Sequence, residues 1–229
     1  MIDQLFQKIY DEVIGKEPMR SFFVKELFKE TWVDWDYLEN KLNDFYHLGV
    51  DKVELINRKR EKYHPKLHTV AWSNRKVIDV EEIFDAVEKN HSMVLLGASR
   101  MHTNINEICR AIEKQVPGSA VDVHVYCGTK KSRSFNIHCD HADNFIIQQT
   151  GRSHWKVYKE YSLDMNQLRN LENDKKLSLD FECTLHPGDM IYIPKHRFHY
   201  AEPLEKRISL SFAVSDGIQP IKRKWYKFK

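Results

Sequence analysis

The strongest constraint on the fold is the spacing of short apolar segments in the second half of the chain. From residue 119 onward, stretches of alternating apolar residues are separated by turn signals at Gly128, Gly151 and Pro187–Gly188. A period of two is typical of half-buried strands, and short strands at this spacing favour a sandwich or a barrel. The sequence therefore predicts a β-rich domain built mainly from residues after 119.

One stretch within this region carries candidate metal ligands. Residues 134–158 predict a strand, a tight connection, a second strand, a turn at Gly151 and a third strand. His138 and Asp140 are two positions apart, so an extended backbone presents both side chains on the same face and Cys139 on the other. An imidazole and a carboxylate at one strand end can bind a metal ion.

A third ligand is predicted downstream. A Pro187–Asp189 turn precedes the apolar strand Met190–Ile193, which Pro194 ends, and His199 is expected to open the next strand. Two histidines and one carboxylate around an open site are the facial triad of non-heme Fe(II) oxygenases.

The order of these motifs resembles a known family. His-x-Asp is followed by Phe-Ile-Ile-Gln-x-x-Gly-x-x-x-Trp, then by Leu-x-Pro-Gly-Asp-x-x-Tyr-Ile-Pro and a further His. This pattern resembles the JmjC-type cupin oxygenases, nearest the branch of the ribosomal oxygenases, over residues 92–214. The resemblance implies an α+β, mainly β fold: a double-stranded β-helix (cupin or jelly-roll) core with N-terminal helices packed on it.

The resemblance also implies a domain plan and a chemistry. We expect a single domain over 1–229, comprising an N-terminal elaboration (1–91), the core (92–214) and a basic aromatic tail (215–229). The family uses Fe(II), 2-oxoglutarate and O2 to hydroxylate a substrate. By analogy the substrate is an amino-acid side chain in a peptide or protein.

The family pattern also selects the metal ligands among the histidines. Its distal His lies five residues after the Pro of Tyr-Ile-Pro, which is His199 in this chain. His138, Asp140 and His199 are therefore the expected ligands and catalytic centre, and His141 and His196 are expected to lie outside it.

One departure from the family concerns the cosubstrate. A Lys or Arg two residues after the Gly of Gln-x-x-Gly usually pairs with the far carboxylate of 2-oxoglutarate, and here that position is Ser153. An unpaired, desolvated carboxylate costs several kcal/mol. Arg207 is the candidate replacement, because alternation places it on one face with Ser209, and Arg-x-Ser after the distal His resembles the cosubstrate motif of other 2-oxoglutarate oxygenases. The alternative is a surface Arg207 paired with Glu202 or Glu205.

Three further residues are expected near the cosubstrate. Tyr126 and His124 come from a strand that carries a Tyr and an Asn in the family, and His124 replaces the Asn. Asn144 shares the strand parity of Asp140 and is expected to line the cavity. Two other functions stay open: a small-molecule tailoring oxygenase of the same fold, and a non-catalytic metal-binding cupin that serves as an interaction module.

The N-terminal part predicts helices and strands outside the core. Helices are expected over 2–15 and over 18–30. Asp34 can cap a third helix, whose apolar face holds Leu38, Leu42, Phe45 and Leu48, and Asp79 begins another, with a capping-box-like motif, to about Asn90. Strands are expected over 50–56 and 67–72, joined by a polar loop. That loop contains Arg58-Lys-Arg60-Glu-Lys62, which is either a solvated surface or a substrate-facing segment.

The composition of the chain limits the classes of partner and the cellular location that we expect. A net charge of +3 is too close to balance to indicate a polyanion partner, so nucleic acid is not expected. No apolar run approaches a membrane span and no signal peptide is visible. Four cysteines without Cys-x-x-Cys spacing favour a reducing, cytoplasmic location. The tail Ile221–Lys229 interleaves Lys with aromatics and either is solvated or contacts RNA or an anionic peptide.

Overall fold

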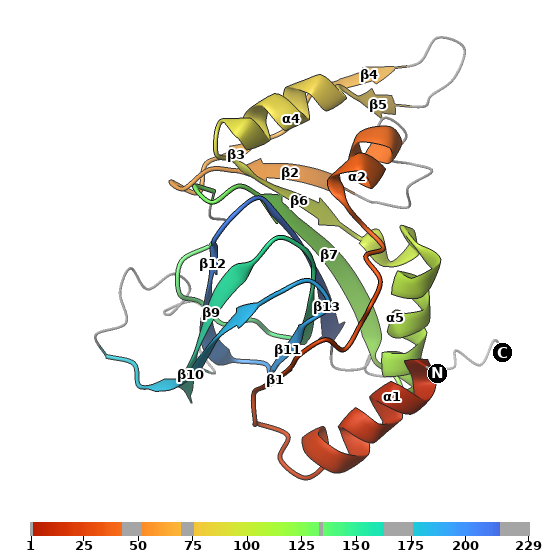
Figure 1. Ribbon diagram of the computed structural model, residues 1–229, viewed down its shortest axis with the longest axis vertical. Coiled ribbons are helices and arrows are strands. Elements are labelled where there is room, and N and C mark those ends of the chain that lie inside the picture. The colour runs from red at the N-terminus through yellow and green to blue at the C-terminus, as the bar shows by residue number, and fades with distance from the viewer. Residues whose placement is uncertain (1, 43–51, 70–75, 133–134, 163–175, 216–229) are drawn as a thin grey trace, which may run out of the picture.

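The core consists of two facing antiparallel sheets (Figure 1). The computed structural model describes residues 2–42, 52–69, 76–132, 135–162 and 176–215. In spatial order the eight-stranded main sheet contains β1 (Phe22–Val24), β11 (Met190–Ile193), β8 (Asp143–Thr150), β13 (Arg207–Ser215), β7 (Ala120–Gly128), β6 (Ser92–Leu96), β2 (Lys52–Ile56) and β3 (Lys62–Tyr63). The small sheet contains β10 (Leu179–Leu185), β9 (Ser153–Tyr161) and β12 (Arg197–Pro203). This architecture confirms the predicted mainly β, jelly-roll fold.

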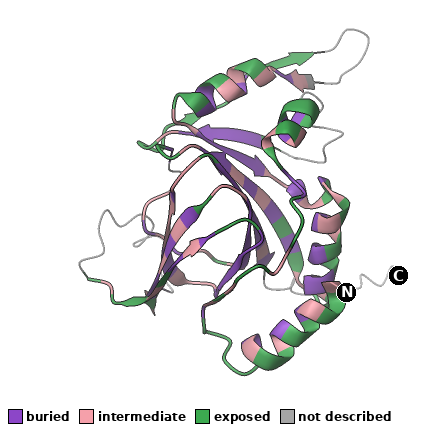
Figure 2. Cartoon of the chain, in the orientation of Figure 1, coloured by how far each residue is buried: buried purple, intermediate pink, exposed green. Residues whose placement is uncertain are grey.

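Helices cover one face of the main sheet. They include α1 (Ile2–Ile9), which continues as the π-helix η1 (Tyr10–Ile14), and α5 (Thr103–Gln115), which follows the 3-10 turn η3 (Ala98–Arg100). Farther along the sheet lie α2 (Trp35–Lys41), α4 (Val80–Glu88) and the hairpin of β4 (Leu67–Thr69) with β5 (Lys76–Ile78). Figure 2 shows exposed residues on the helices and mostly buried ones in the central strands. No helix in the described part of the chain is long and apolar enough to cross a membrane.

Strand alternation gives the main sheet two different faces. On β13, Ile208, Leu210, Phe212 and Val214 join the apolar core beneath the helices. The intervening residues of β13 point toward the small sheet, as the alternation of a pleated strand requires. A second apolar cluster fills the space between the sheets: Ile146, Trp155, Val157, Cys183, Leu185, Ile191 and Ile193. The pocket described below lies on this inner face.

The predicted helix caps are confirmed. Asp34 accepts a hydrogen bond from the Tyr37 backbone N–H (2.7 Å), and Asp79 accepts one from that of Glu82 (3.1 Å). Such caps satisfy N–H groups that the first helical turn leaves unpaired. Two residues of the third predicted helix, Phe45 and Leu48, lie outside the described residues.

The helix predicted over residues 18–30 is wrong. This segment contains the edge strand β1, in which Phe22 pairs with Tyr192 of β11. After β1 the chain is held against the turn before β11, because the Asp189 carboxylate accepts from the Glu26 N–H (2.8 Å) and the Gly188 carbonyl accepts from the Phe28 N–H (3.1 Å). Pairing with a sheet edge overrides the local helical pattern.

Two other predictions need adjustment. Residues 135–140 form no regular strand, and an isolated bridge joins His138 to His199. His199 lies inside β12 rather than at its start. The strand expected over 67–72 is present as β4 over its described part, Leu67–Thr69, and pairs with β5. Residues 163–175 and the tail from residue 216 lie outside the described residues.

Candidate metal centre and its pocket

Two histidines are brought together by backbone pairing between distant segments. The His138 N–H donates to the His199 carbonyl (3.1 Å), and the His199 N–H donates to the His138 carbonyl (2.8 Å). This bridge places the imidazole rings 4.3 Å apart between their centroids. The bridge therefore supplies the proximity that a regular strand at 135–140 was expected to provide.

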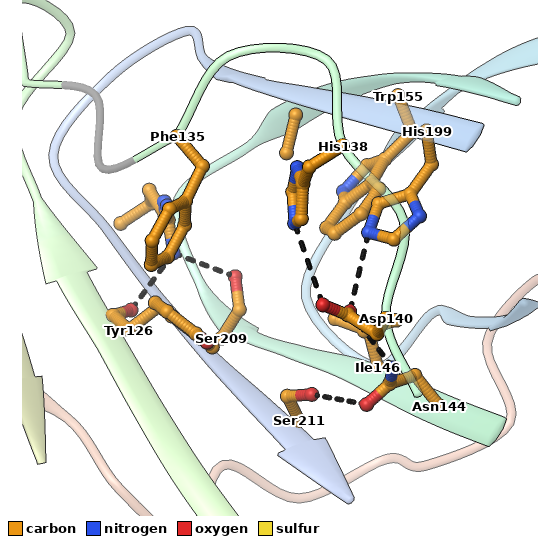
Figure 3. Close-up of a pocket in the computed structure, with 12 residues that line it drawn as sticks. Tyr126, Phe135, His138, Asp140, Asn144, Ile146, Trp155, His199, Ser209 and Ser211 are labelled. Atoms are coloured by element: carbon orange, nitrogen blue, oxygen red, sulfur yellow. Dashed lines mark hydrogen bonds and ion pairs between the residues drawn. The ribbon is translucent and has the colours of Figure 1, made fainter. Parts of the chain in front are cut away.

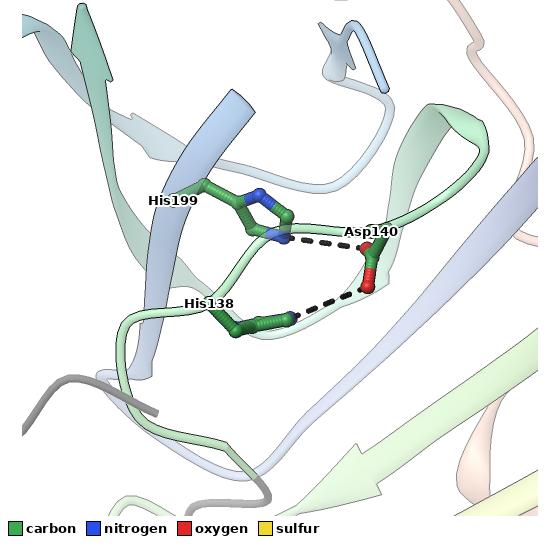
Figure 4. Close-up of side chains that lie close together, drawn as sticks. All are labelled: His138, Asp140 and His199. Atoms are coloured by element: carbon green, nitrogen blue, oxygen red, sulfur yellow. Dashed lines mark ion pairs between the residues drawn. The ribbon is translucent and has the colours of Figure 1, made fainter. Parts of the chain in front are cut away.

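The Asp140 carboxylate faces both rings (Figure 4). Its Oδ1 lies 3.9 Å from His138 Nε2, and its Oδ2 lies 3.5 Å from His199 Nε2. One ligand atom from each of the three residues lies within 4.8 Å of the others. Ligand atoms about 2.1 Å from a common ion are at most about 4.2 Å apart, so both distances to Asp140 suit a shared metal.

Backbone carbonyls fix how the two imidazoles present their nitrogens. His138 Nδ1 lies 2.8 Å from the Asn136 carbonyl, and His199 Nδ1 lies 3.0 Å from that of Arg197. A carbonyl only accepts, so each Nδ1 carries a proton, and in the neutral imidazole Nε2 then keeps its lone pair. Both lone pairs then point toward the Asp140 carboxylate, which is also an acceptor. Three electron-pair donors directed at one point suit a cation.

Burial favours the neutral form of His199. The side chain is almost fully buried, and desolvation, together with the nearby His138, lowers the pKa of His199 to about 4. The imidazole is therefore uncharged at neutral pH, which is the form that binds metals. Asp140 is positioned in turn by the Asn144 amide, which donates to Oδ2 (3.0 Å) and accepts from the Ser211 hydroxyl (3.0 Å).

A small inner cavity extends from these three residues toward the interior (Figure 3). Arg207 lies in its wall and is 6% exposed. One terminal guanidinium nitrogen donates to the Tyr126 carbonyl (2.9 Å) and the Ser209 hydroxyl (3.3 Å), and Nε has no hydrogen-bond partner among the described residues. Burial lowers the pKa of Arg207. The pocket wall therefore holds a buried cation.

Neither carboxylate considered as a surface partner pairs with Arg207. Glu205 binds Arg152 instead, with Nε 3.0 Å from the carboxylate, and no ion pair joins Glu202 to Arg207 in the described part of the chain. An isolated buried charge costs several kcal/mol. The inner cavity is thus suited to an anion.

Gln148 organises the polar groups beside Arg207. Its Oε1 accepts from the hydroxyls of Ser209 (2.9 Å) and Ser153 (2.7 Å), and the Ser153 hydroxyl accepts from the Trp155 indole N–H (2.9 Å). Ser209 therefore uses its proton on Gln148 and its lone pair on Arg207. Ser209 thus holds the guanidinium in place, and its predicted contact with the cosubstrate stays a prediction. Ser153 is buried behind this network and does not line the cavity.

A close approach of two backbones fixes the start of β13. Gly151 has a φ of +63°, and a Cβ placed there would lie 2.1 Å from the Lys206 carbonyl oxygen and 2.9 Å from the Arg207 Cα. Only glycine accepts both the conformation and the contact. The pairing of β8 with β13 also shifts register between Ile208 and Ser209, beside this contact.

A second, outer cavity adjoins the inner one and shares several lining residues with it, among them Tyr126, His138 and Asp140. His124 lines the outer cavity and not the inner one, and His124 Nε2 lies 2.9 Å from the Asp122 carboxylate. This hydrogen bond lowers the pKa of Asp122. Arg60, from the loop between β2 and β3, also lines the outer cavity. The predicted role of His124 near the cosubstrate stays a prediction.

Most of the predicted site residues meet in one place. His138, Asp140, His199, Tyr126, Asn144, Arg207 and Ser209 all line the inner cavity. His141 and His196 lie outside the triad and pack against each other, with ring centroids 5.5 Å apart. Sequence reasoning did not identify the apolar wall, which consists of Phe135, Ile146, Trp155 and Ala201. Alternation from Asn144 indicates Ile146, but Trp155 and Ala201 come from the facing sheet, whose register no sequence pattern gives.

Curated proteins with related sequences carry oxygenase names. Ribosomal oxygenase 1 of Homo sapiens is 26% identical over 221 residues, which are 93% of this chain and 32% of that protein. The bifunctional lysine-specific demethylase and histidyl-hydroxylase NO66 of Caenorhabditis elegans is 27% identical over 180 residues, 72% of this chain and 24% of that protein. The chain thus spans about a third or less of these relatives.

Solved structures share the fold. The X-ray structure of Escherichia coli ycfD has a TM-score of 0.61 at 17% identity and covers 93% of this chain and 53% of its own. YcfD, a ribosomal oxygenase from Escherichia coli, in complex with cobalt and 2-oxoglutarate, has a TM-score of 0.60 at 19% identity and covers 87% of this chain and 49% of its own.

The family model described as the JmjC domain matches residues 94–221, more than half of the chain. This range contains the triad, the inner cavity and the strands that carry them. The chain belongs to the JmjC domain family.

Proposed function

We propose that this protein is an Fe(II)- and 2-oxoglutarate-dependent oxygenase that hydroxylates an amino-acid side chain in a peptide or protein. The observation that carries the proposal is a His-Asp-His donor set beside a buried Arg207 that has no carboxylate partner among the described residues. Two histidines and a carboxylate suit non-heme iron. The names of the relatives, ribosomal oxygenase and histidyl-hydroxylase, support a protein substrate.

In this proposal His138, Asp140 and His199 hold the metal. Fe(II) would supply the activation of O2, coupled to oxidative decarboxylation of 2-oxoglutarate to succinate. The chain itself orients both imidazoles through backbone carbonyls, keeps His199 neutral by burial, and fixes Asp140 through Asn144. Such outer contacts set the orientation and basicity of metal ligands.

Arg207 would bind the far carboxylate of 2-oxoglutarate. Its guanidinium lies in the cavity wall, where an oxoacid carboxylate can neutralise the buried charge. Ser209 and the Tyr126 carbonyl hold one end of the guanidinium. Arg207 thereby replaces the basic residue that this chain lacks at Ser153, and it approaches the cavity from β13 instead of β9.

The apolar wall and the outer cavity would have separate roles, water exclusion and substrate entry. Phe135, Ile146 and Trp155 exclude water from the inner cavity, which prevents unproductive oxidation. The substrate side chain would enter from the outer cavity, past His124. We also propose a cytoplasmic location, which the four free, buried cysteines support.

An anaerobic absorption titration tests the proposal. Fe(II)-loaded protein titrated with 2-oxoglutarate should develop a visible metal-to-ligand charge-transfer band, and Asp140→Ala should abolish it. Fe(II) binding without a band at saturating oxoacid would contradict the 2-oxoglutarate assignment and favour a metal-binding cupin without this chemistry. Peptide and small-molecule substrates are then distinguished by mass spectrometry, which detects an added oxygen.

A further inference from the structure

The loop between β2 and β3 lies between the outer cavity and a second hollow. Arg60, which lines the outer cavity, follows directly on Arg58 and Lys59, which line the neighbouring hollow. We call this hollow the basic groove. Its lining residues are Asn57, Arg58, Lys59, Glu61, Lys89, Asn90 and Lys131. The loop therefore connects the basic groove to the outer cavity, through which the substrate side chain enters in the proposed function.

The charge of the basic groove is strongly one-sided. It contains four cationic side chains and one carboxylate, that of Glu61. Lys89 pairs with Asp85 (3.6 Å), whereas Arg58, Lys59 and Lys131 form no ion pair within the described residues. All three are exposed. Positive charge gathered along a concave surface attracts an anionic partner far more than the chain's net charge of +3 suggests.

The loop is held in one conformation by its own side chains. The Asn57 amide donates to the Glu61 carboxylate (2.6 Å), and the Glu61 N–H donates to the Asn57 side-chain oxygen (3.0 Å). Arg60 has a φ of +68°, and its N–H donates to the Asn57 carbonyl (2.8 Å). A turn closed in this way presents its cations at fixed positions, which lowers the entropic cost of binding.

We propose that the basic groove binds an acidic segment of the polypeptide substrate, adjacent in sequence to the residue that is hydroxylated. This inference rests on the proposed function, because it assumes that a peptide side chain occupies the outer cavity. The peptide backbone leaving that cavity passes Arg60 and reaches Arg58 and Lys59, where Asp or Glu side chains neutralise the groove. The resulting selectivity is for target residues with acidic neighbours.

The chemistry of the groove favours a peptide over a nucleic acid. Proteins that bind single-stranded nucleic acid combine basic side chains with aromatic ones on which bases stack. The described lining of the basic groove contains no aromatic residue. Its cations can pair with carboxylates, and the described lining offers no ring on which a base could stack.

Binding of labelled probes tests this proposal without requiring turnover. A short fluorescein-labelled peptide of alternating Glu and Ser is titrated with the full chain at low and high salt, with fluorescence anisotropy as the readout. The charge reversal Arg58→Glu/Lys59→Glu should weaken binding by about tenfold, since two attractions become repulsions, and high salt should weaken binding to the unchanged protein. Lys16→Glu/Lys29→Glu, an identical change in net charge away from the groove, should leave affinity nearly unchanged.

Two results would overturn the proposal. Equal weakening by both double variants would mean that only net charge attracts the peptide. Tighter binding of a length-matched oligouridylate than of the peptide, lost in Arg58→Glu/Lys59→Glu, would identify a nucleic-acid surface instead. The 2-oxoglutarate absorption band, measured on the same variants, should stay unchanged. If a variant loses peptide binding but keeps the band, the result tests the groove alone. If the band is absent from the unchanged protein, the result contradicts the proposed function and says nothing about the groove.

Discussion

The two faces of strand β13 are built on opposite principles. On the helix side, Ile208, Leu210 and Phe212 are fully buried and belong to the apolar core. On the pocket side, Arg207, Ser209 and Ser211 are also buried but polar, and the charge of Arg207 has no carboxylate partner among the described residues. The first face stabilises the fold. The second face lowers the stability of the ligand-free protein, because it buries a charge that only a bound anion would neutralise. Four substitutions test this division.

Removing the carboxylate of the triad should have the largest functional effect. Asp140→Ala should lower Fe(II) affinity by more than about 100-fold, because even partners of metal ligands are worth about 10- to 100-fold, and turnover should be lost. The free energy of unfolding should stay within about 1 kcal/mol, because Asp140 is only half-buried and contributes little packing. Calorimetric Fe(II) titration and urea unfolding measure both. Asp122→Ala should retain Fe(II) affinity, and an equal loss there would contradict the ligand assignment.

On the helix face a substitution should affect the free energy of unfolding more than the binding of ligands. Phe212→Ala should lower the free energy of unfolding by about 3–5 kcal/mol, because it leaves a cavity in the core beneath α1 and α5. The fraction that remains folded should bind Fe(II) and 2-oxoglutarate normally. Urea unfolding and the charge-transfer titration test the two statements. Phe212→Leu, which keeps most of the volume, should recover most of the stability.

Arg207 should separate function from stability most sharply. Arg207→Met should weaken 2-oxoglutarate binding by about 100-fold, because charge-assisted hydrogen bonds are lost. The same change should raise the free energy of unfolding by about 1–3 kcal/mol, because a well-packed apolar side chain replaces an unpaired buried charge. Arg152→Met, at an exposed pair with Glu205, should change neither measurably. Unchanged 2-oxoglutarate affinity in Arg207→Met would remove Arg207 from the cosubstrate site.

The smallest effect is expected at Ser209. Ser209→Ala removes one contact to the guanidinium and one donor to Gln148. We expect a loss of about fivefold in 2-oxoglutarate affinity, corresponding to one ordinary hydrogen bond, with Fe(II) affinity unchanged. A loss as large as that of Arg207→Met would show that Ser209 contacts the cosubstrate directly. Ser215→Ala, at the exposed end of the same strand, is the matched control.

The sequence predicted those features that depend on local patterns. Alternation on β13 placed Arg207 and Ser209 on one face, Asp34 and Asp79 capped their helices, and motif order selected His138, Asp140 and His199. Prediction from sequence failed where pairing with a distant strand determines the secondary structure. Residues 18–30 carry a helical pattern, yet the unsatisfied edge of β11 recruits Phe22–Val24 as a strand.

The cosubstrate side of the site depended on contacts that spacing does not reveal. Ser153 was recognised as a departure, but its role as a donor to Gln148 became visible only with β8 and β9 in place. Strand parity placed His124 on the same face as Tyr126, but His124 lines the outer cavity and not the inner one, and it pairs with Asp122. Strand parity gives the face of a sheet on which a residue lies. It does not give the position along the pocket.

The contact between Gly151 and β13 has a consequence for how the sequence can vary. Since the Lys206 carbonyl occupies the space of any Cβ at position 151, every substitution there should displace the strand that carries Arg207. Ser153, two residues away, is constrained differently, because its hydroxyl is buried between the Gln148 amide and the Trp155 indole. In a saturation mutagenesis scan Gly151 should be intolerant of all replacements, whereas position 153 should accept small residues and reject large ones. The absence of a side chain at position 151 is thus a condition for keeping Arg207 in the wall of the inner cavity.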